Sequence, residues 1–201
     1  MSTKILGIVG SYRRGGTIDS LVAETLSSAE ECGAETTKIY LIDQRIEFCS
    51  NCRQCAQEPG EKRGRCIHDD DMGRILAQWD DSDAMVLGAP VNFFNVNAVT
   101  RRFMERLVCY AYWPWDVPRG PQVRTKARPK RAVLITSSAM PALMGRVFTG
   151  AIRALKVTAR TMGARPVATI FAGMAATGEH ARPPARAIRK ARAAGRKLAG
   201  V

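Results

Sequence analysis

Short apolar runs alternate with segments of helical periodicity along the 201-residue chain. Five runs that end in turn or polar residues predict buried β-strands at residues 4–10, 35–42, 84–90, 131–138 and 164–173. Between them, apolar side chains recur at helical spacing, as Met72, Ile75, Leu76 and Trp79 do. The pattern predicts five helices, over 18–33, over 69–83, from Val96 onward, over 145–163 and over 184–200.

This alternation of strand and helix predicts the α/β class, with a doubly wound five-stranded parallel sheet and helices on both faces. No internal repeat or low-complexity segment divides the chain, so we expect residues 1–201 to form a single domain. Two segments break the pattern: a cysteine-rich insert at 48–68 and a basic, proline-containing loop at 114–130. Ligands of such sheets bind beyond the carboxyl ends of the strands, which directs attention to the loops after the first, third and fourth strands.

Charge is distributed unevenly along the chain. The net charge is +13, yet residues 1–118 hold 13 Lys and Arg against 17 Asp and Glu, and residues 119–201 hold 18 against one. A basic half can attract nucleic acid, anionic lipid, an acidic protein or a phosphorylated cofactor. The terminal segment 184–200 has an apolar side and basic remaining faces, which favours an ordinary surface helix over a nucleic-acid site. No apolar run approaches the ~20 residues of a membrane span and the N-terminus lacks a signal-peptide pattern, so we expect a cytoplasmic protein.

The first loop, "GSYRRGGT" at residues 10–17, joins a strand to a helix, where backbone N–H groups and the helix dipole favour an anion. Its side chains suit a phosphate: hydroxyls from Ser11 and Thr17, charge from Arg13 or Arg14, and close backbone approach at Gly15 and Gly16. The alternative interpretation is a glycine-rich turn in which Thr17 is a simple N-cap.

Four cysteines lie in "FCSNCRQCAQEPGEKRGRC", residues 48–66, and three of them have C-x2-C-x2-C spacing. In a reducing compartment such a group indicates metal ligands or redox thiols more than a disulfide. Zinc, an iron-sulfur cluster and metal-free thiols all remain open, although the short spacings are closer to a ferredoxin pattern than to paired zinc knuckles. Cys32 and Cys109 stand among apolar neighbours in predicted helices, so we expect them to be small buried hydrophobes.

Two stretches, "GIVGSYRRGGTIDSLV" and "CIHDDDMGRILAQWDDSDAMVLGAPVNFFNVNAVTRRFMERL", resemble the NADPH-dependent FMN reductases of flavodoxin-like fold. The resemblance implies a flavodoxin-like fold with FMN phosphate on the first loop and the flavin ring on the loop at 89–99. By the resemblance, the FMN-binding residues are Ser11, Arg13, Gly15, Gly16, Thr17, Pro90, Val91, Asn92, Phe93, Phe94, Asn95, Ser137, Ser138 and Met140. Pro90, Val91, Phe93 and Phe94 would form the apolar wall for the ring. The sequence departs from the family at Asn92, where a tyrosine is common.

The iron-sulfur flavoprotein branch of this family carries a compact cysteine motif in the same place. The resemblance therefore implies that Cys49, Cys52, Cys55 and Cys66 ligate a [4Fe-4S] cluster, with a ten-residue gap before Cys66 that is longer than in the usual motif. It also implies that "RRFMER" takes the place of the family's Lys-x-Phe-x-Asp-Arg, and there we expect Arg106 to form a structural ion pair.

The activity implied by the resemblance is that of an FMN-dependent NAD(P)H oxidoreductase, which passes electrons to a small-molecule acceptor or to a ferredoxin-like electron carrier. The flavin performs the redox chemistry, so no catalytic side chain is predicted. We expect a homodimer or tetramer, with the aromatic stretch at 110–115 contributing to a subunit interface. The alternative is a non-enzymatic flavodoxin-like electron carrier, or a binding module with a basic C-terminal docking surface.

Overall fold

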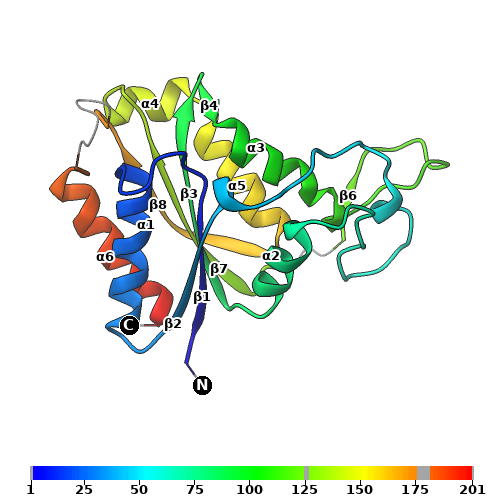
Figure 1. The fold of residues 1–201 in the computed structure, drawn as a ribbon, viewed down its shortest axis with the longest axis horizontal. Coiled ribbons are helices and arrows are strands. Elements are labelled where there is room, and N and C mark those ends of the chain that lie inside the picture. Colours follow the sequence, from blue (N-terminus) through cyan, green and yellow to red (C-terminus); the bar gives the residue numbers. More distant parts are fainter. Residues whose placement is uncertain (1, 125–126, 176–181, 201) are drawn as a thin grey trace.

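The computed structural model describes residues 2–124, 127–175 and 182–200, and a parallel sheet forms its centre (Figure 1). The strands lie in the order β2-β1-β3-β7-β8, which is the flavodoxin-like order in which the winding reverses between β1 and β3. The bounds are β1 Lys4–Val9, β2 Glu35–Tyr40, β3 Ala84–Asn92, β7 Lys130–Ser137 and β8 Ala164–Ala172. The predicted fold class is therefore confirmed.

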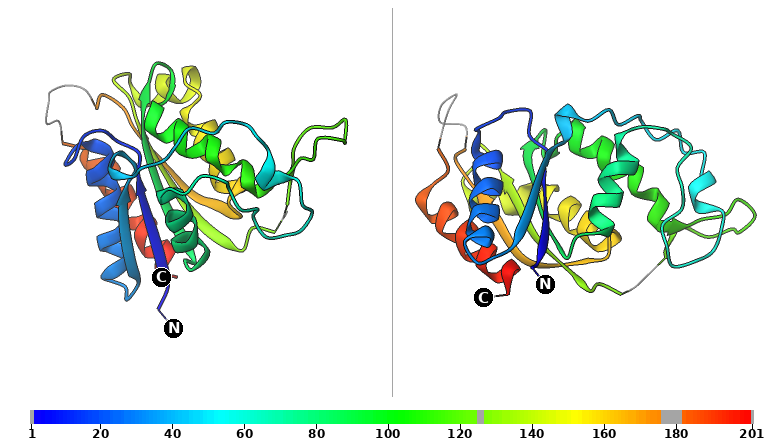
Figure 2. Two further views of the ribbon diagram at one scale, coloured as in Figure 1. Left: turned by 45° about the vertical axis from the view of Figure 1, so that its right-hand side comes forward. Right: turned by 60° about the horizontal axis from the view of Figure 1, so that its bottom comes forward.

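Helices cover both faces of the sheet, as the views in Figure 2 show. The α-helices are α1 Thr17–Glu30, α2 Asp71–Asp80, α3 Ala98–Glu105, α4 Ala142–Phe148, α5 Ala151–Thr161 and α6 Ala185–Ala199, and short 3-10 helices are η1 Leu41–Asp43, η2 Gln54–Ala56 and η3 Arg106–Tyr110. Helices α1 and α6 share one apolar cluster with the sheet, and α2, α3 and α5 share the other. The two clusters lie on opposite sides of strands whose side chains alternate between them, such as Ile5 with Leu6 and Val133 with Leu134.

The prediction of a single helix over 145–163 is wrong, because parts of two helices occupy that stretch. Helix α4 ends at Phe148 and α5 begins at Ala151, with Gly150 as its N-cap. The Gly150 N–H donates to the Phe94 carbonyl (2.8 Å), so the tip of another loop fixes the break. A helical residue at 150 would direct that N–H back into its own helix instead.

The structure corrects three further boundaries. The helix expected from Val96 begins at Ala98, because Val96 belongs to β4, Asn95–Val96, which pairs with β3 as an antiparallel hairpin. Strand β2 ends at Tyr40 and continues as η1. Helix α1 ends at Glu30, so Cys32 lies in the following turn and is only partly buried.

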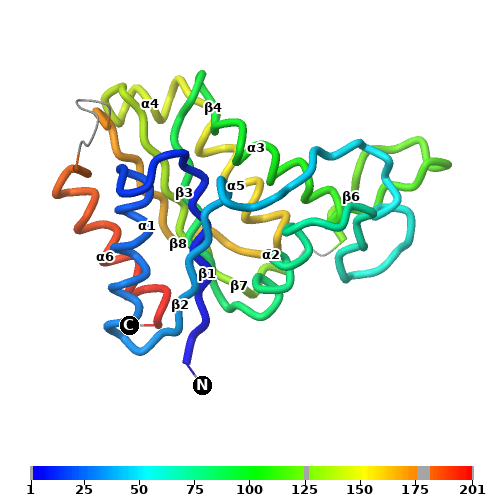
Figure 3. Tube along the Cα trace, viewed as in Figure 1, coloured from blue at the N-terminus to red at the C-terminus, as the bar shows by residue number. Residues whose placement is uncertain are grey.

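The cysteine-rich insert lies beyond the sheet, beside the end of α3, and the chain trace shows it as a wide excursion (Figure 3). It packs against a second excursion that carries the short antiparallel pair β5 Ala111–Tyr112 and β6 Gln122–Val123. Backbone hydrogen bonds join the two: Gly64 donates to Cys109 (2.9 Å) and Trp113 donates to Ala56 (2.8 Å). The basic loop at 114–130 is thus partly structured, and its residues 125–126 lie outside the described residues.

Candidate functional site

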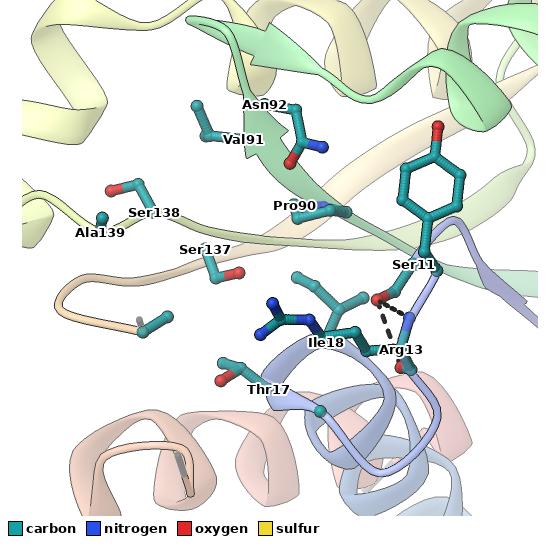
Figure 4. Close-up of a pocket in the computed structure, with 13 residues that line it drawn as sticks. Ser11, Arg13, Thr17, Ile18, Pro90, Val91, Asn92, Ser137, Ser138 and Ala139 are labelled. Carbon is teal, nitrogen blue, oxygen red and sulfur yellow. Dashed lines mark hydrogen bonds between the residues drawn. The ribbon is translucent and has the colours of Figure 1, made fainter. Parts of the chain in front are cut away.

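A cavity of about 310 Å³ opens where β1, β3 and β7 reach their carboxyl ends (Figure 4). Its walls come from the loop between β1 and α1, from the end of β3, and from the loops after β7 and β8. The lining residues are Ser11, Tyr12, Arg13, Gly16, Thr17, Ile18, Pro90, Val91, Asn92, Ser137, Ser138, Ala139 and Ala175. Three loops that are far apart in sequence therefore meet at the reversal of winding, where such sheets bind ligands.

The loop before α1 presents a cation and hydroxyl groups to the cavity. Ser11 Oγ accepts a hydrogen bond from the Arg13 N–H (3.0 Å), which folds the loop so that the Arg13 side chain extends into the cavity (Figure 4). The helix begins at Thr17 and its N-cap is Gly16, so the alternative in which Thr17 caps the helix is wrong. The first N–H groups of a helix have no partner within that helix, and together with Arg13 they create an environment that favours an anion.

Two neighbouring residues of the same loop do not line the cavity. The guanidinium of Arg14 pairs with Asp43 and lies 4.2 Å from the centre of the Tyr40 ring. Gly15 has a left-handed backbone (φ +68°), and its N–H donates to the Asp19 carboxylate (2.7 Å). Of the two arginines predicted to offer charge, the structure therefore brings only Arg13 into the cavity.

The start of this loop is anchored from α3, by residues that sequence reasoning missed. The Gly10 carbonyl accepts hydrogen bonds from Asn97 Nδ2 (2.6 Å) and Thr100 Oγ1 (3.2 Å), and the Gly10 N–H donates to the Gly88 carbonyl (2.7 Å). Asn97 is also the N-cap of α3, and an N-cap signal could have identified it. A side chain at Gly10 would collide with Thr100, so this close approach requires glycine.

At the other end of the cavity, the last residues of β3 form a wall. Pro90 and Val91 offer apolar surface, and Asn92 presents an amide (Figure 4). The next two predicted ring contacts, Phe93 and Phe94, do not line the cavity: they form the exposed turn of the β3-β4 hairpin, both at positive φ (47° and 63°). Asn95, also outside the lining, uses its side-chain oxygen to accept the Val96 N–H (2.8 Å).

The third wall follows β7. Ser137 and Ser138 line the cavity as the sequence predicts, whereas Met140 does not, although its carbonyl accepts from Ser138 Oγ (3.1 Å) and from the Met174 N–H (3.0 Å). The Ala175 N–H donates to the Ser138 carbonyl (2.9 Å), which brings the loop after β8 to the cavity. Ala139 and Ala175 are thus lining residues that no side-chain signal in the sequence could reveal.

The four cysteines of the insert lie on one side of the molecule, but they do not form a ready metal site. Cys55 is buried, and burial raises the pKa of its thiol to about 11, with further contributions from Cys66, Cys49 and Cys52. The four thiols are therefore within electrostatic reach of one another. Across the described parts of the chain, however, no group of three or more His, Cys, Asp or Glu side chains is arranged to hold a metal ion.

Cys109, predicted as a buried hydrophobe, is buried but is not remote from this group. It lines a second cavity of about 700 Å³ together with Cys66 and Arg106. Burial raises the pKa of its thiol to about 12, and both Cys55 and Cys66 contribute to the rise. A fifth thiol therefore lies near two of the four that the sequence groups together, Cys55 and Cys66.

Three arginines organise the cysteine-rich insert. Arg106 pairs with Asp70, donates to the Glu47 carbonyl (2.8 Å) and lies 3.4 Å from Cys66 Sγ, so the predicted structural ion pair is confirmed. Arg53 stacks between two indoles, with its guanidinium carbon 3.3 Å from the ring centre of Trp113 and 4.0 Å from that of Trp115. Arg124 donates to several carbonyls of the insert and its neighbour, namely those of Cys55, Glu58, Gly60 and Cys109.

The strand order defines a protein of the flavodoxin-like class, and its cavity at the reversal of winding is bordered by a cationic loop before α1. Over residues 3–179 the chain matches the family of NADPH-dependent FMN reductases. The chain belongs to that family.

Curated relatives carry the name iron-sulfur flavoprotein. One, from Archaeoglobus fulgidus, is 31% identical over 111 residues, which are 55% of this chain and 48% of that protein. The chain spans about half the length of the curated relatives it matches.

Among solved structures, an NAD(P)H:quinone oxidoreductase from Methanothermobacter marburgensis is similar at 16% identity, with a TM-score of 0.69 over 98% of this chain and 100% of that one. An FMN-dependent NADH-azoreductase from Bacillus anthracis, solved in complex with FMN, is 14% identical, with a TM-score of 0.68 over 100% of this chain and 98% of that one. These likenesses establish the fold. In the described part of the chain, no helix has the length and apolar character needed to cross a membrane.

Proposed function

We propose that the chain is an FMN-dependent NAD(P)H oxidoreductase whose cofactor occupies the cavity at the ends of β1, β3 and β7. The observation that carries the proposal is the placement of Arg13 and the N-terminus of α1 at one end of a cavity whose other end is formed by Pro90 and Val91. FMN has the same division, a charged phosphate at one end and a flat apolar ring at the other. The family match and the FMN complex of a structural neighbour support the same cofactor.

In this proposal each wall has a separate task. Arg13, Ser11, Gly16 and Thr17 hold the phosphate by charge and hydrogen bonds, while Gly15 provides the turn. Pro90 and Val91 pack on the ring and exclude water from one side. The amide of Asn92 and the residues Ser137 and Ser138 offer polar contacts at the ring edge.

When bound, FMN supplies the redox chemistry: it accepts electrons from NAD(P)H and passes them to an acceptor. The protein binds and orients it, and no side chain is assigned a catalytic proton transfer. The physiological acceptor is a small molecule or a ferredoxin-like carrier.

The test is a flavin titration followed by assays of NADH and NADPH oxidation in the presence of quinone and azo acceptors. We expect wild-type protein to bind FMN and oxidise at least one nicotinamide, and Arg13→Gln to weaken FMN binding roughly ten- to hundred-fold, because it removes a charged donor. Arg186→Gln is the control: it removes the same charge from an exposed residue of α6 and should leave FMN binding unchanged. A wild-type chain that binds no FMN would rule out the proposal.

We further propose that Cys49, Cys52, Cys55 and Cys66 hold a [4Fe-4S] cluster. The names of the relatives, the thiolate donor set and the electrostatic reach among the four thiols support this. In the described residues, no three of these side chains are arranged to hold a single metal ion, so the proposal rests on the donor set and the relatives and not on a preformed metal site. A cluster, when bound, supplies one-electron transfer to a carrier.

Zinc and metal-free thiols are the competing states of this insert. Anaerobic purification, followed by an absorption spectrum and iron, sulfide and zinc analysis, separates them. About four irons and four sulfides per chain would support the cluster. Flavin without iron or sulfide after anaerobic reconstitution would refute it, and stoichiometric zinc would establish the structural alternative.

The alternative function is that of a non-enzymatic electron carrier or binding module with a basic docking surface. Its support is the charge of the C-terminal part, since residues 119–201 hold 18 Lys and Arg against a single acidic residue. Fast reduction of the FMN-loaded chain by an acidic carrier, without oxidation of NADH or NADPH, would favour this function over the enzyme.

We also propose that the protein is cytoplasmic and forms a homodimer or a dimer of dimers. All six cysteines lie in the described residues and none of them forms a disulfide, which is the state that a reducing compartment favours. Among the exposed apolar side chains of the described residues, Phe93 and Phe94 lie at the tip of the hairpin, and Leu143, Val147 and Phe148 lie on α4. The Gly150 N–H, just after α4, donates to the Phe94 carbonyl (2.8 Å). Exposed apolar side chains gathered in one region mark contact sites, and a second copy of the chain is the partner that we propose.

A further inference from the structure

Asp19 is a charged side chain on the first turn of α1 that is almost completely buried, with 6% of its surface exposed. Its carboxylate accepts three hydrogen bonds: from the Gly15 N–H on Oδ2 (2.7 Å), and from Lys38 Nζ (3.2 Å) and the Tyr40 hydroxyl (3.0 Å) on Oδ1. Burial alone would raise the pKa of this carboxyl, but the hydrogen bonds outweigh burial and hold the pKa below its usual value. Asp19 is therefore an anion.

The donors to Asp19 come from two different elements. Gly15 belongs to the loop before α1, whereas Lys38 and Tyr40 belong to β2 at the edge of the sheet. Asp19 thus joins the loop to β2. The Tyr40 ring continues the connection, since the guanidinium of Arg14 lies on its face and pairs with Asp43 beyond it.

This network acts on the side of the loop that faces away from the cavity. Arg14 and Gly15 are directed toward β2 and η1, while Arg13, Gly16 and Thr17 line the cavity. Gly15 has a left-handed backbone conformation (φ +68°). Because glycine also populates other backbone conformations readily, a hydrogen bond is needed to select this one, and the Asp19 carboxylate provides it by accepting the Gly15 N–H. Lys38 compensates the charge of Asp19, which lies next to the proposed phosphate site but does not line it.

We propose that Asp19, supported by Tyr40 and Lys38, is a positioning residue that presets the loop at 10–17 for the phosphate of FMN. The inference rests on the proposed function, because it assigns a role in binding the same cofactor. The positioning role has a specific consequence: the network raises the affinity for a flavin that carries a phosphate and leaves the affinity for the flavin ring unchanged. FMN and riboflavin share the ring and differ in the phosphate, so they separate the two contributions.

The central variant is Asp19→Asn. The amide keeps the shape of the side chain, but its one oxygen can accept either from Gly15 or from the pair Lys38 and Tyr40, whereas the carboxylate serves both. We expect FMN affinity to fall roughly ten- to hundred-fold, as for the loss of a hydrogen bond to a charged group, with riboflavin affinity unchanged. Quenching of flavin fluorescence measures both affinities.

Tyr40→Phe is the milder second variant, since it removes one donor and keeps the ring beneath Arg14. It should reduce FMN affinity in the same direction by a smaller factor. The matched control is Glu24→Gln, which neutralises another acid of α1 that pairs with Arg192 on α6 (3.2 Å), and it should change neither affinity. Circular dichroism and thermal unfolding establish that each variant is folded.

The outcomes distinguish this inference from the proposed function. If wild-type protein binds FMN, and folded Asp19→Asn binds it equally well or loses FMN and riboflavin affinity in equal proportion, the positioning role is wrong while the FMN site stands. If Asp19→Asn does not fold, Tyr40→Phe decides by the same criterion. If wild-type protein binds no FMN, the proposed function fails, and the positioning role fails with it.

Discussion

Arg106 and Asp70 form an ion pair that is closed off from water, with 1% and 0% of their side chains exposed. The carboxylate also accepts the N–H groups of Glu47 (2.8 Å) and Met72 (3.1 Å), and so joins the two ends of the cysteine-rich insert to the start of α2. The charges gain little net energy from each other after desolvation, but either one alone would be a buried and uncompensated charge. The pair therefore fixes where the insert begins and ends.

At the scale of single residues, we predict that Arg106→Met lowers the free energy of unfolding by about 3–5 kcal/mol, because Asp70 is left buried without its partner. Arg101→Ala is the control: its pair with Glu105 is exposed (56% and 46%), so its removal should cost at most about 1 kcal/mol. Urea unfolding of both variants and wild type measures the difference. Equal costs for the two variants would contradict a special role for the buried pair.

The same ion pair predicts that the free energy of unfolding depends on pH in the acid range. Burial tends to raise the pKa of Asp70, but Arg106 and the backbone donors outweigh it and hold that pKa below the usual value of 3.8. A depressed pKa in the folded state stabilises the fold above 3.8, and this contribution is lost as the pH falls through the folded value. Below pH 3.8, wild type should lose stability more steeply than Arg106→Met, in which the depression is reduced. Urea unfolding at several pH values measures this. If the free energy of unfolding fell with pH equally steeply in wild type and Arg106→Met, the ion pair would not be the source of the acid dependence.

At the scale of elements, the β3-β4 hairpin departs from the usual chemistry of a two-residue turn. Its central residues Phe93 and Phe94 both have positive φ, a conformation that commonly takes Asn and Gly. Large side chains in this conformation are strained, and such strain tends to be retained where a residue has a function. Their exposure beside the cavity places that function at the molecular surface.

We predict that Phe94→Gly is more stable than Phe94→Ala by about 1 kcal/mol, because both variants lose the ring and only glycine relieves the left-handed backbone. The comparison of the two separates backbone strain from the contacts of the ring. Chemical denaturation of each variant at one protein concentration gives the difference. If alanine proved as stable as glycine, the turn would not be strained.

These elements also mark where sequence reasoning succeeds and where it fails. The parallel sheet was predictable because its central strands are nearly continuous apolar runs. The place of the loop at 10–17 between β1 and α1, beside the cavity, was predictable because its glycines and hydroxyls follow such a run. The break at Gly150 was not, because its cause is a hydrogen bond to Phe94, a residue distant in the sequence. The hairpin was missed because aromatic residues occupy its turn, and Ala175 because its contribution is a backbone position.

At the scale of the whole molecule, the exposed apolar side chains and the proposed flavin cavity lie at the same end of the sheet. The hairpin tip is bonded to the chain just after α4, because the Gly150 N–H donates to the Phe94 carbonyl (2.8 Å). We call the exposed apolar side chains of α4 and the hairpin tip the rim; its Leu143 and Val147 are 75% and 69% exposed. A second copy that covered this rim would bury apolar surface and would also shield the cavity from solvent. Association and flavin binding would then support each other, because each would stabilise the same arrangement of the rim.

We therefore predict that Leu143→Lys combined with Val147→Glu, which places two opposite charges on the rim and leaves the net charge unchanged, converts the proposed homodimer into a monomer. Light scattering after gel filtration measures the mass, and fluorescence titration should show weaker binding of both FMN and riboflavin, since the rim lies at the ring end of the cavity. Val157→Lys, on an exposed position of α5 away from the rim, is the control that should remain dimeric. A wild-type chain that is monomeric at high concentration, or a rim variant that still dimerises, would show that α4 does not form the interface. Loss of dimerisation with unchanged flavin affinity would show that assembly and flavin binding are independent.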